Sequence, residues 1–296
     1  MAVDSPEFTQ ATYDKVADAY DDLWSRYVAE PNAKLTRALD LKRGERVADL
    51  ACGTGLFTVP MAQAVAPGEV VGVDVSEGML AAAQKRAGDQ GLHLTLDQDK
   101  IEDFVAQAQP QSFDVVSLRF ALAYIDWSRV LPRIGAVVRP GGRVGVLTNT
   151  TASVPQFYEL FDHYRRSFDA AWKLYKHFRK SFGEAWKIYW QLRDTFGDGA
   201  FISVPDSADT VVERLTQGGL EPVETWTDRI RLWFRSGEEA VAWMEESGYA
   251  THPTLEHVSP DTLRFLETLF AEGLEGFRER QGIPLDFVIA GVVARK

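Results

Sequence analysis

Short apolar runs alternate with amphipathic segments through the first half of the chain. Five runs have the character of buried strands, and they lie at 47–50, 70–76, 92–96, 113–118 and 143–148. Between them, apolar residues recur at steps of three and four, which is the spacing of a helix with one buried face. This alternation of strand and helix predicts an α/β fold with a parallel sheet.

Helices are expected before and between these runs. Two precede the first strand, at 8–29 and 32–41, and the others are expected at 56–65, from Glu77 to Gly88 or Gly91, and at 126–138. Ser76 and Asp126 stand at the start of two of them, where a short polar side chain can accept from a free backbone N–H. We therefore expect both to be N-cap residues.

The turn after the first strand carries the first chemical signal. Gly53-Thr54-Gly55 follows the apolar run at 47–50 and leads into the helix at 56–65. Glycines let a backbone approach a ligand closely, and a helix N-terminus presents free N–H groups with partial positive charge. Such a turn is typical of a site for a nucleotide-like or carboxylate-bearing cofactor.

Acidic residues near this turn narrow the choice of cofactor. Asp74 lies at the end of the second apolar run, 19 residues beyond Gly55, where dinucleotide-binding folds have a ribose-binding acid. Thr58 occupies the position of the third glycine in Gly-x-Gly-x-x-Gly, which counts against a pyrophosphate dinucleotide. The carboxylate of Asp49 is also unfavourable beside a diphosphate, whereas it is favourable near the amino group of a methionine moiety.

Four motifs resemble those of class I S-adenosylmethionine-dependent methyltransferases. They are DLACGTG at 49–55, GVDVSEGML at 72–80, FDVVSLRFALAYI at 113–125 and VVRPGGRVGVL at 137–147. Within that class the chain is similar to the ubiquinone/menaquinone-biosynthesis-like small-molecule group (methyltransferase type 11), and the resemblance covers about residues 10–150. It implies a Rossmann-like fold with a mostly parallel seven-stranded sheet, an antiparallel last strand and a helical insertion or lid. It also implies S-adenosylmethionine as cofactor and S-adenosylhomocysteine as product.

The resemblance also implies cofactor-binding residues, which in this sequence are Asp49, Gly53, Gly55, Asp74, Met79, Asp99 and Arg119. Asp74 would accept from the ribose hydroxyls, and Met79 would lie against adenine or in the core. The acid that accepts from the adenine amino group is Asp99 or Asp97, of which we favour Asp99. Arg119 would pair with the methionine carboxylate or with a substrate.

The N-terminal helix caps the cofactor in similar enzymes. Tyr13 and Tyr20 would then line the site, or they would simply pack the helix down. We identify no catalytic residue, because the sulfonium carries the reactivity and the protein mainly aligns donor and acceptor. The five histidines show neither a Ser-His-Asp arrangement nor metal-ligand spacing, so no metal is expected.

Composition sets limits on partners and location. A hydrophobic content of 45% is ordinary for a globular protein, and a net charge of −11 argues against nucleic acid as a partner. The single cysteine, Cys52, excludes an internal disulfide. No signal peptide and no apolar run near the ~20 residues of a membrane span is found, so a cytoplasmic protein is expected.

A threefold repeat follows the fifth strand. The units are SVPQFYELFDHYRR, SFDAAWKLYKHFRK and SFGEAWKIYWQLRD, of 14 residues each, at 153–194. Fourteen residues are almost four helical turns, so equivalent aromatic residues such as Tyr158, Trp172 and Trp186 share one face. An unbroken helix would be ~63 Å long at ~1.5 Å per residue, and we expect a break at Gly183.

This repeat predicts a helical lid over the active site or a contact between two subunits. Its residues 163–193 carry eight Lys or Arg against two acids, so contact with a membrane surface or an anionic partner is the alternative. His163 and His177 recur at one repeat position and are expected to be solvated rather than catalytic.

Four segments follow from this reading. They are an N-terminal helical cap at 1–45, a cofactor-binding core at 46–150, the repeat insertion at 151–200 and a C-terminal completion of the sheet at 201–296. The last segment is predicted to contain helix and strand at 211–234, a long helix from Pro260 to about Gln281, and a final strand.

The resulting hypothesis is methyl transfer from S-adenosylmethionine to a C, O or N atom of a small aromatic or hydrophobic molecule. One alternative is a protein of the same fold that binds the cofactor without methylating, as a cyclase-like catalyst or a partner-binding protein. Another is a nicotinamide-dependent oxidoreductase, which Thr58 disfavours.

Overall fold

The computed structural model describes residues 10–11, 13–14, 17, 20–175, 204–247 and 260–296 of the 296-residue chain. These residues form two compact units. The first holds the described residues of Met1–Ser153, Ser203–Ile230 and Val288–Lys296, and the second holds those of Val154–Ile202 and Arg231–Phe287.

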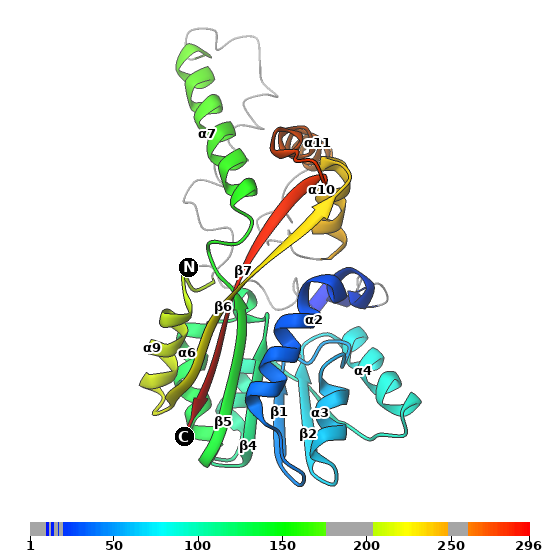
Figure 1. The fold of residues 1–296 in the computed structure, drawn as a ribbon, viewed down its shortest axis with the longest axis vertical. Coiled ribbons are helices and arrows are strands. Elements are labelled where there is room, and N and C mark those ends of the chain that lie inside the picture. Colours follow the sequence, from blue (N-terminus) through cyan, green and yellow to red (C-terminus); the bar gives the residue numbers. More distant parts are fainter. Residues whose placement is uncertain (1–9, 12, 15–16, 18–19, 176–203, 248–259) are drawn as a thin grey trace. The chain divides into compact units, whose positions relative to one another are not determined.

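A seven-stranded sheet runs through the described residues in the order β3-β2-β1-β4-β5-β7-β6 (Figure 1). The strands are β1 (Arg46–Leu50), β2 (Glu69–Asp74), β3 (Thr95–Gln98), β4 (Phe113–Arg119), β5 (Val138–Asn149), β6 (Glu221–Phe234) and β7 (Ile283–Arg295). The first five pair in parallel, whereas β7 is antiparallel to β5. The predicted Rossmann-like sheet is confirmed.

The pairing register brings four strand ends together. Leu50 at the end of β1 aligns with Val73 of β2 and Leu118 of β4, and Asp74 aligns with Gln98 of β3. Because parallel strands all point the same way, the loops that leave β1, β2, β3 and β4 meet at one edge of the sheet. Ligands of open α/β sheets bind at such an edge.

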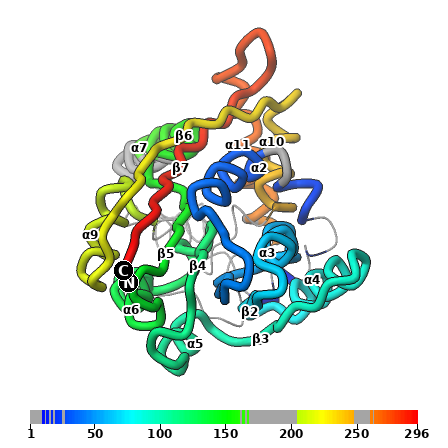
Figure 2. The backbone as a smooth tube through the Cα atoms, turned by 60° about the horizontal axis from the view of Figure 1, so that its bottom comes forward, coloured from blue at the N-terminus to red at the C-terminus, as the bar shows by residue number. Residues whose placement is uncertain are grey.

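Helices cover both faces of this sheet (Figure 2). One face carries α2 (Tyr20–Leu39), α3 (Thr58–Val65) and α4 (Glu77–Asp89), and the other carries α5 (Ile101–Gln107), α6 (Trp127–Val137) and α9 (Ala208–Gln217). A hydrophobic core lies on the second face, where Leu50, Val116 and Leu118 pack with Ile134 and Leu215, all at most 1% exposed. Burial of such side chains contributes about 1.5–3 kcal/mol each.

Gly145 of β5 lets α2 pack closely on the first face. A Cβ there would lie 2.9 Å from side-chain atoms of Leu35 and Leu39. Both leucines are fully buried. The helix α2, whose first residue Tyr20 lines the cavity at the cofactor edge, therefore rests directly on the sheet backbone.

The predicted break between two N-terminal helices is wrong, because α2 continues through Pro31. Proline removes one backbone N–H from a helix interior. Here the side-chain amide of Asn32 donates to the carbonyl of Val28 at 2.7 Å, which supplies a local hydrogen bond at that turn. The burial of Tyr27, Val28 and Leu35 then holds the helix on the sheet despite the proline.

Several boundaries also differ from the predictions. β3 begins at Thr95 rather than at residue 92, and β5 begins at Val138 because Phe113 pairs with Val138 across a register shift. The long C-terminal helix α11 (Pro260–Leu274) ends earlier than expected and is followed by a short 3-10 turn, Glu275–Phe277. Ser76 is confirmed as an N-cap, whereas Asp126 occupies the cap position without a side-chain cap hydrogen bond.

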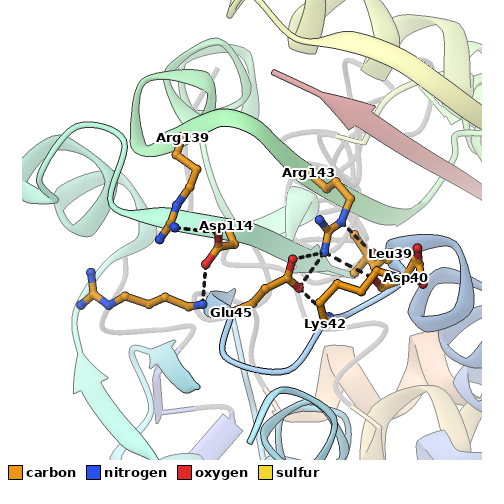
Figure 3. A network of polar contacts seen from close by, with 8 residues as sticks. Leu39, Asp40, Lys42, Glu45, Asp114, Arg139 and Arg143 are labelled. Atoms are coloured by element: carbon orange, nitrogen blue, oxygen red, sulfur yellow. Dashed lines mark hydrogen bonds and ion pairs between the residues drawn. The ribbon is translucent and has the colours of Figure 1, made fainter. Parts of the chain in front are cut away.

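Ion pairs and hydrogen bonds link charged residues at the opposite end of the sheet, where the parallel strands begin (Figure 3). Arg143 pairs with Glu45 at 2.7 Å and donates through Nε to the Leu39 carbonyl, also at 2.7 Å. Arg139 pairs with Asp114 at 2.8 Å. A cation at the carboxyl end of α2 offsets the partial negative charge there.

The second unit contains helices α7 (Pro155–Tyr175), α10 (Gly237–Glu246) and α11. The ring of Phe157 in α7 stacks on Phe270 of α11 at 4.2 Å, and the Tyr164 hydroxyl donates to the Leu269 carbonyl at 2.9 Å. The helix predicted at the start of the repeat is confirmed as far as Tyr175. Residues 176–194 of the repeat, with Gly183, lie outside the described residues. Among the described helices, none has the length and apolar character to cross a bilayer.

Candidate functional site

A cavity of about 290 Å³ opens at the carboxyl ends of β1, β2, β3 and β4. Its wall combines residues that follow these strands with two tyrosines of the N-terminal segment. The strand-end residues are Ala51, Gly53, Asp74, Val75, Met79, Asp99 to Asp103, Arg119 to Ala121, Tyr124 and Ile125, and the tyrosines are Tyr13 and Tyr20. Of the seven residues predicted for the cofactor, five lie on this wall, and Asp49 and Gly55 do not.

The glycine turn is built from left-handed backbone. Gly53 has φ +54° and Gly55 has φ +73°, and Ala51 adopts φ +57°. A Cβ on Gly53 would meet nothing within 4 Å, so the cavity reaches this backbone position. A Cβ on Gly55 would instead lie 2.9 Å from the Cβ of Ala83, so Gly55 serves the packing of the turn on α4.

Asp74 organises the centre of the wall. Its carboxylate accepts from the Gly53 N–H at 2.9 Å and from the Ser76 N–H at 3.0 Å. Burial raises the pKa of Asp74, and these backbone hydrogen bonds oppose that rise. The acid thus ties the glycine turn to the start of α4.

Asp49 and Arg119 form a buried ion pair at the base of the turn. Arg119 Nη1 lies 3.1 Å from Asp49 Oδ1, and the two side chains are 5% and 4% exposed. Asp49 Oδ2 accepts from the Thr58 hydroxyl at 2.6 Å. Burial raises the pKa of Asp49, and the guanidinium opposes this rise. Burial lowers the pKa of Arg119, and the carboxylate opposes that.

Arg119 has donor capacity beyond this pair. Its Nη2 contacts Met61 Sδ at 3.4 Å, and its guanidinium carbon lies 5.7 Å from the Phe57 ring centroid. Its buried Nε has no hydrogen-bond partner among the described residues. A guanidinium carries five N–H donors. Buried donors without acceptors are costly, so this one calls for an explanation.

The two acids considered for the adenine amino group, Asp97 and Asp99, lie in different places. Asp99 follows β3 and lies on the cavity wall, whereas Asp97 is within β3 and is absent from the wall. Asp99 accepts from the backbone N–H of Lys100 at 2.8 Å. Met79 is 1% exposed and also borders the cavity.

Three phenols gather on the wall. Tyr13 packs edge-on against Tyr20 and Tyr124, with ring centroids 6.0 and 5.5 Å apart, and its phenol is hydrogen-bonded to Tyr124. Burial and the neighbouring phenols raise the pKa of Tyr13 and Tyr20 well above the usual value. Both hydroxyls therefore stay protonated near neutral pH. Tyr124 is not among the predicted cofactor residues, although residues 119–124 follow the fourth strand and are expected at the edge where ligands bind.

Two acids of the N-terminal segment, also missed in the sequence, hold that segment beside the cavity. Asp14 Oδ1 accepts from the Ser76 hydroxyl at 2.5 Å and from the Gly78 N–H at 3.0 Å. Asp21 Oδ1 accepts from the Thr54 hydroxyl at 2.6 Å. The three partners lie within two residues of predicted cofactor residues. Because they lie far from the acids in sequence, no local pattern predicts these contacts.

No metal site is found within the part of the chain that the structure describes. In those ranges, no group of three or more His, Cys, Asp or Glu side chains is arranged to hold an ion.

Comparison with known proteins identifies the family. Residues 47–142 match the family described as a methyltransferase domain. The chain is 30% identical over 175 residues to ubiquinone/menaquinone biosynthesis C-methyltransferase UbiE of Bdellovibrio bacteriovorus, covering 55% of this chain and 71% of that protein. It is also 30% identical over 176 residues to demethylmenaquinone methyltransferase of Bacillus cytotoxicus, with the same 55% and 71% coverage.

A solved structure extends the likeness of fold to the whole chain. The [4+2]-cyclase SpnF matches with a TM-score of 0.58 at 15% identity, over 100% of this chain and 98% of that one. At that identity the likeness concerns the fold alone. The sheet order, the glycine turn with Asp74 beside it, and the two relatives lead to one conclusion: this chain is an enzyme of the class I S-adenosylmethionine-dependent methyltransferase family.

Proposed function

We propose that this enzyme transfers the methyl group of S-adenosylmethionine to a ring carbon of a small, apolar aromatic acceptor of the quinol kind. The names of the two curated relatives support a quinone-type acceptor. The phenols, Phe120, Ile125 and Met79 on the wall support an aromatic one, since aromatic rings pack well against such side chains.

The observation that carries the proposal is the order of groups along the wall. Following the strand order β3, β2, β1, β4, the wall presents Asp99, Asp74, Gly53 and Arg119. S-adenosylmethionine has adenine, ribose, sulfonium and an amino-acid end in the same linear order. Asp99 would accept from the adenine amino group and Asp74 from the ribose hydroxyls, while the Gly53 backbone would adjoin the sulfur.

Two local features suit this cofactor. Open space over Gly53 accommodates a ligand that a side chain would displace. Arg119, which Asp49 holds in a buried ion pair, is on the wall at the β4 end, where the carboxylate of the amino-acid end would lie. Arg119 also retains the unpaired Nε donor.

The cofactor supplies an electrophilic methyl group when bound. The chain's own part would be to hold both reactants in line and to exclude water, and Tyr13 and Tyr20, which line the cavity, would contribute to the second. Their protonated hydroxyls would donate to an oxygen of the acceptor. A carboxylate of the α5 turn, Glu102 or Asp103, would accept a proton that the acceptor loses.

Mass spectrometry of ligand that stays bound through purification tests the cofactor. S-adenosylhomocysteine or its parent supports the proposal, whereas NAD(P) overturns it. Incubation with S-adenosylmethionine and reduced demethylmenaquinone analogues should then give a C-methylated ring. Methylation confined to oxygen or nitrogen acceptors would refute the ring-carbon assignment.

The likeness in fold to the cyclase SpnF favours one second candidate, a cofactor-binding protein that does not methylate. It predicts tight S-adenosylhomocysteine binding without methyl transfer to any acceptor in a broad panel. The same assay separates the two.

A further inference from the structure

The sheet of the described residues has two edge strands, which differ in length. β3 ends one side of the sheet with four residues, whereas β6 ends the other side, beside β7, with fourteen (Figure 2). An edge strand presents backbone N–H and C=O groups without a partner in the sheet, and short length is one way to keep such an edge from pairing. β6 lacks this protection, so its edge is able to pair with another strand.

Every second residue of β6 belongs to an exposed row. Side chains at alternate positions of a strand share one face. In the part of β6 that belongs to the first compact unit, the row on one face is Glu221, Val223, Thr225, Thr227 and Arg229, and all five are exposed. Val223 is 52% exposed. The row thus has opposite charges at its two ends and three β-branched residues between them.

The opposite face of this segment has partners within its own chain. Trp226 packs on Gly291 of β7, and Asp228 accepts from Lys34 of α2 at 2.9 Å. The ammonium of Lys34 also lies 5.0 Å from the centre of the Trp226 ring. These contacts hold β6 in the sheet and leave the row on the face away from α2.

The two charges of the row cannot neutralise each other within one chain. Glu221 and Arg229 are eight residues apart, which is ~27 Å at ~3.4 Å per residue. Neither forms an ion pair with another of the residues that the structure describes. Each charge therefore has room for a partner from outside.

Antiparallel pairing of two copies of β6 supplies these partners. A twofold axis at Thr225 places this residue opposite its own copy and Val223 opposite Thr227. Glu221 of each copy then lies opposite Arg229 of the other. Directly opposed side chains are close neighbours on one face, and both opposite charges and β-branched residues are favourable there.

The two neighbouring registers lose this complementarity. An axis one residue later pairs Glu221 with Arg231, whose guanidinium already has two carboxylate partners in its own chain. An axis one residue earlier places Arg229 opposite Gly219, which precedes the strand. Only the axis at Thr225 joins both free charges of the row.

We propose that the edge of β6 at residues 221–229 is an interaction surface for a second copy of this chain, paired antiparallel about a twofold axis at Thr225. An interface of this symmetry needs a surface that is complementary to itself, and the row meets this condition. Charges on an edge discourage pairing with most other strands, whereas here each charge meets its opposite. The inference goes beyond the proposed function and holds for any reaction at the cavity.

Light scattering of the full chain over a range of concentrations tests the pairing. The unmodified enzyme should approach twice the mass of one chain as the concentration rises. Thr225→Lys sets two ammonium groups against each other at the axis and should give the mass of one chain. Thr95→Lys is the matched control, because it adds the same charge at an exposed threonine of the other edge strand, β3, and it should leave the mass unchanged.

An exchange of charges tests the register. Glu221→Arg or Arg229→Glu alone brings like charges together at both ends of the paired segment. Either should weaken dimerisation roughly 2- to 30-fold, from the loss of two opposite-charge pairs. The double variant restores both pairs with their signs exchanged and should dimerise as the unmodified enzyme does. Both side chains are exposed, so the fold should survive each change.

Hydrogen exchange locates the contact. Amides of residues 221–229 should exchange more slowly as the unmodified enzyme dimerises, and they should stay fast in Thr225→Lys. A single-chain mass at every concentration overturns the inference and leaves the edge to a strand of a different protein. A dimer that survives Thr225→Lys overturns it as well, because the subunits would then meet elsewhere. Failure of the double charge variant to recover would contradict the axis at Thr225.

Discussion

Asp74 has the surroundings that lead most directly to a prediction about cofactor binding. It is buried, receives two backbone N–H groups, and has a raised pKa whose causes are burial first and, more weakly, the charge of Asp49. Asp74→Ala should weaken S-adenosylhomocysteine binding by ~1–3 kcal/mol, because the ribose hydroxyls lose their acceptor. Calorimetry measures this, and Asp97→Ala, which changes an acid of β3 away from the wall, is the control. Equal losses in both variants would contradict the assignment.

The raised pKa of Asp74 also predicts a pH dependence of binding. Ribose hydroxyls donate to the ionised carboxylate, so binding favours the form that has lost its proton. Affinity for S-adenosylhomocysteine should fall as the pH drops through the raised pKa. Asp74→Asn, which carries no proton to lose, should bind more weakly but without that pH dependence. A profile of the same shape in both proteins would show that another group titrates.

Gly53 supports a steric prediction. Gly53→Val places a branched side chain in the open space over the turn and should abolish cofactor binding while the chain still folds. Gly91→Val is a matched control, because Gly91 also has a positive φ, +66°, and open surroundings, but it lies off the cavity wall. Thermal unfolding should show similar losses of stability for both variants. Normal cofactor binding by Gly53→Val would contradict the proposed position of the turn.

Single residues at strand ends could be predicted from the sequence, and residues brought in from elsewhere could not. Asp74, Gly53 and Asp99 follow from the rule that ligands bind where parallel strands end. Whether Asp97 or Asp99 reaches the wall depends on where β3 ends, which the apolar run at 92–96 misplaced. Asp14 and Asp21 contact residues 62 and 33 positions away, and such pairings exist only in the folded chain.

At the scale of elements, apolar periodicity located most helices and strands but not where each begins and ends. The two helices predicted at 8–29 and 32–41 are joined in α2, which runs through Pro31 because its buried face outweighs the lost hydrogen bond. The expectation of a seven-stranded, mostly parallel sheet came from the resemblance, and the order of the strands comes from the structure, since periodicity carries no information about which strands are neighbours.

The packing of β7 against β6 gives a test of stability. A Cβ on Gly291 would lie 2.1 Å from Cε2 of Trp226, so the indole lies directly over the glycine. Gly291→Ala should lower the free energy of unfolding by ~1–3 kcal/mol through overpacking. Gly88→Ala in α4, where a Cβ meets nothing within 4 Å, should be neutral or slightly stabilising. Urea unfolding compares them, and a neutral Gly291→Ala would mean that Trp226 moves aside easily.

The repeat at 153–194 remains a prediction of a lid or a subunit contact. The aromatic residues that share one face of this repeat, among them Trp172 and Tyr175, form its aromatic stripe. If the stripe faces the acceptor, replacing Trp172 and Tyr175 by Ala should reduce turnover or acceptor binding. Cofactor affinity should then change by less than ~0.5 kcal/mol. A stripe between subunits would instead change the mass measured by light scattering. Retention of both activity and mass would leave the stripe as internal packing.

At the scale of the whole molecule, the methyltransferase motifs describe only one part of the chain. The first compact unit collects three separate stretches, and the second is made of what lies between them, Val154–Ile202 and Arg231–Phe287. The four consecutive segments expected from the sequence follow chain order, whereas the compact units follow contacts between distant segments. The residues of the cavity wall likewise come from several strand ends and from the N-terminal segment at once, so no single stretch of sequence describes the cavity.

β7 is synthesised last, yet it lies between β5 and β6 in the sheet. Its residue Ile289 pairs with Asn149, so 140 residues separate the two partners (289 − 149). At ~5–20 residues per second, a ribosome needs roughly 7–28 s to make that stretch. During this interval the edge of β5, with apolar Val144 and Val146, has no strand to pair with, and open edges of this kind recruit other chains. The yield of folded enzyme in a cell should therefore depend on chaperones that cover the nascent sheet during those seconds.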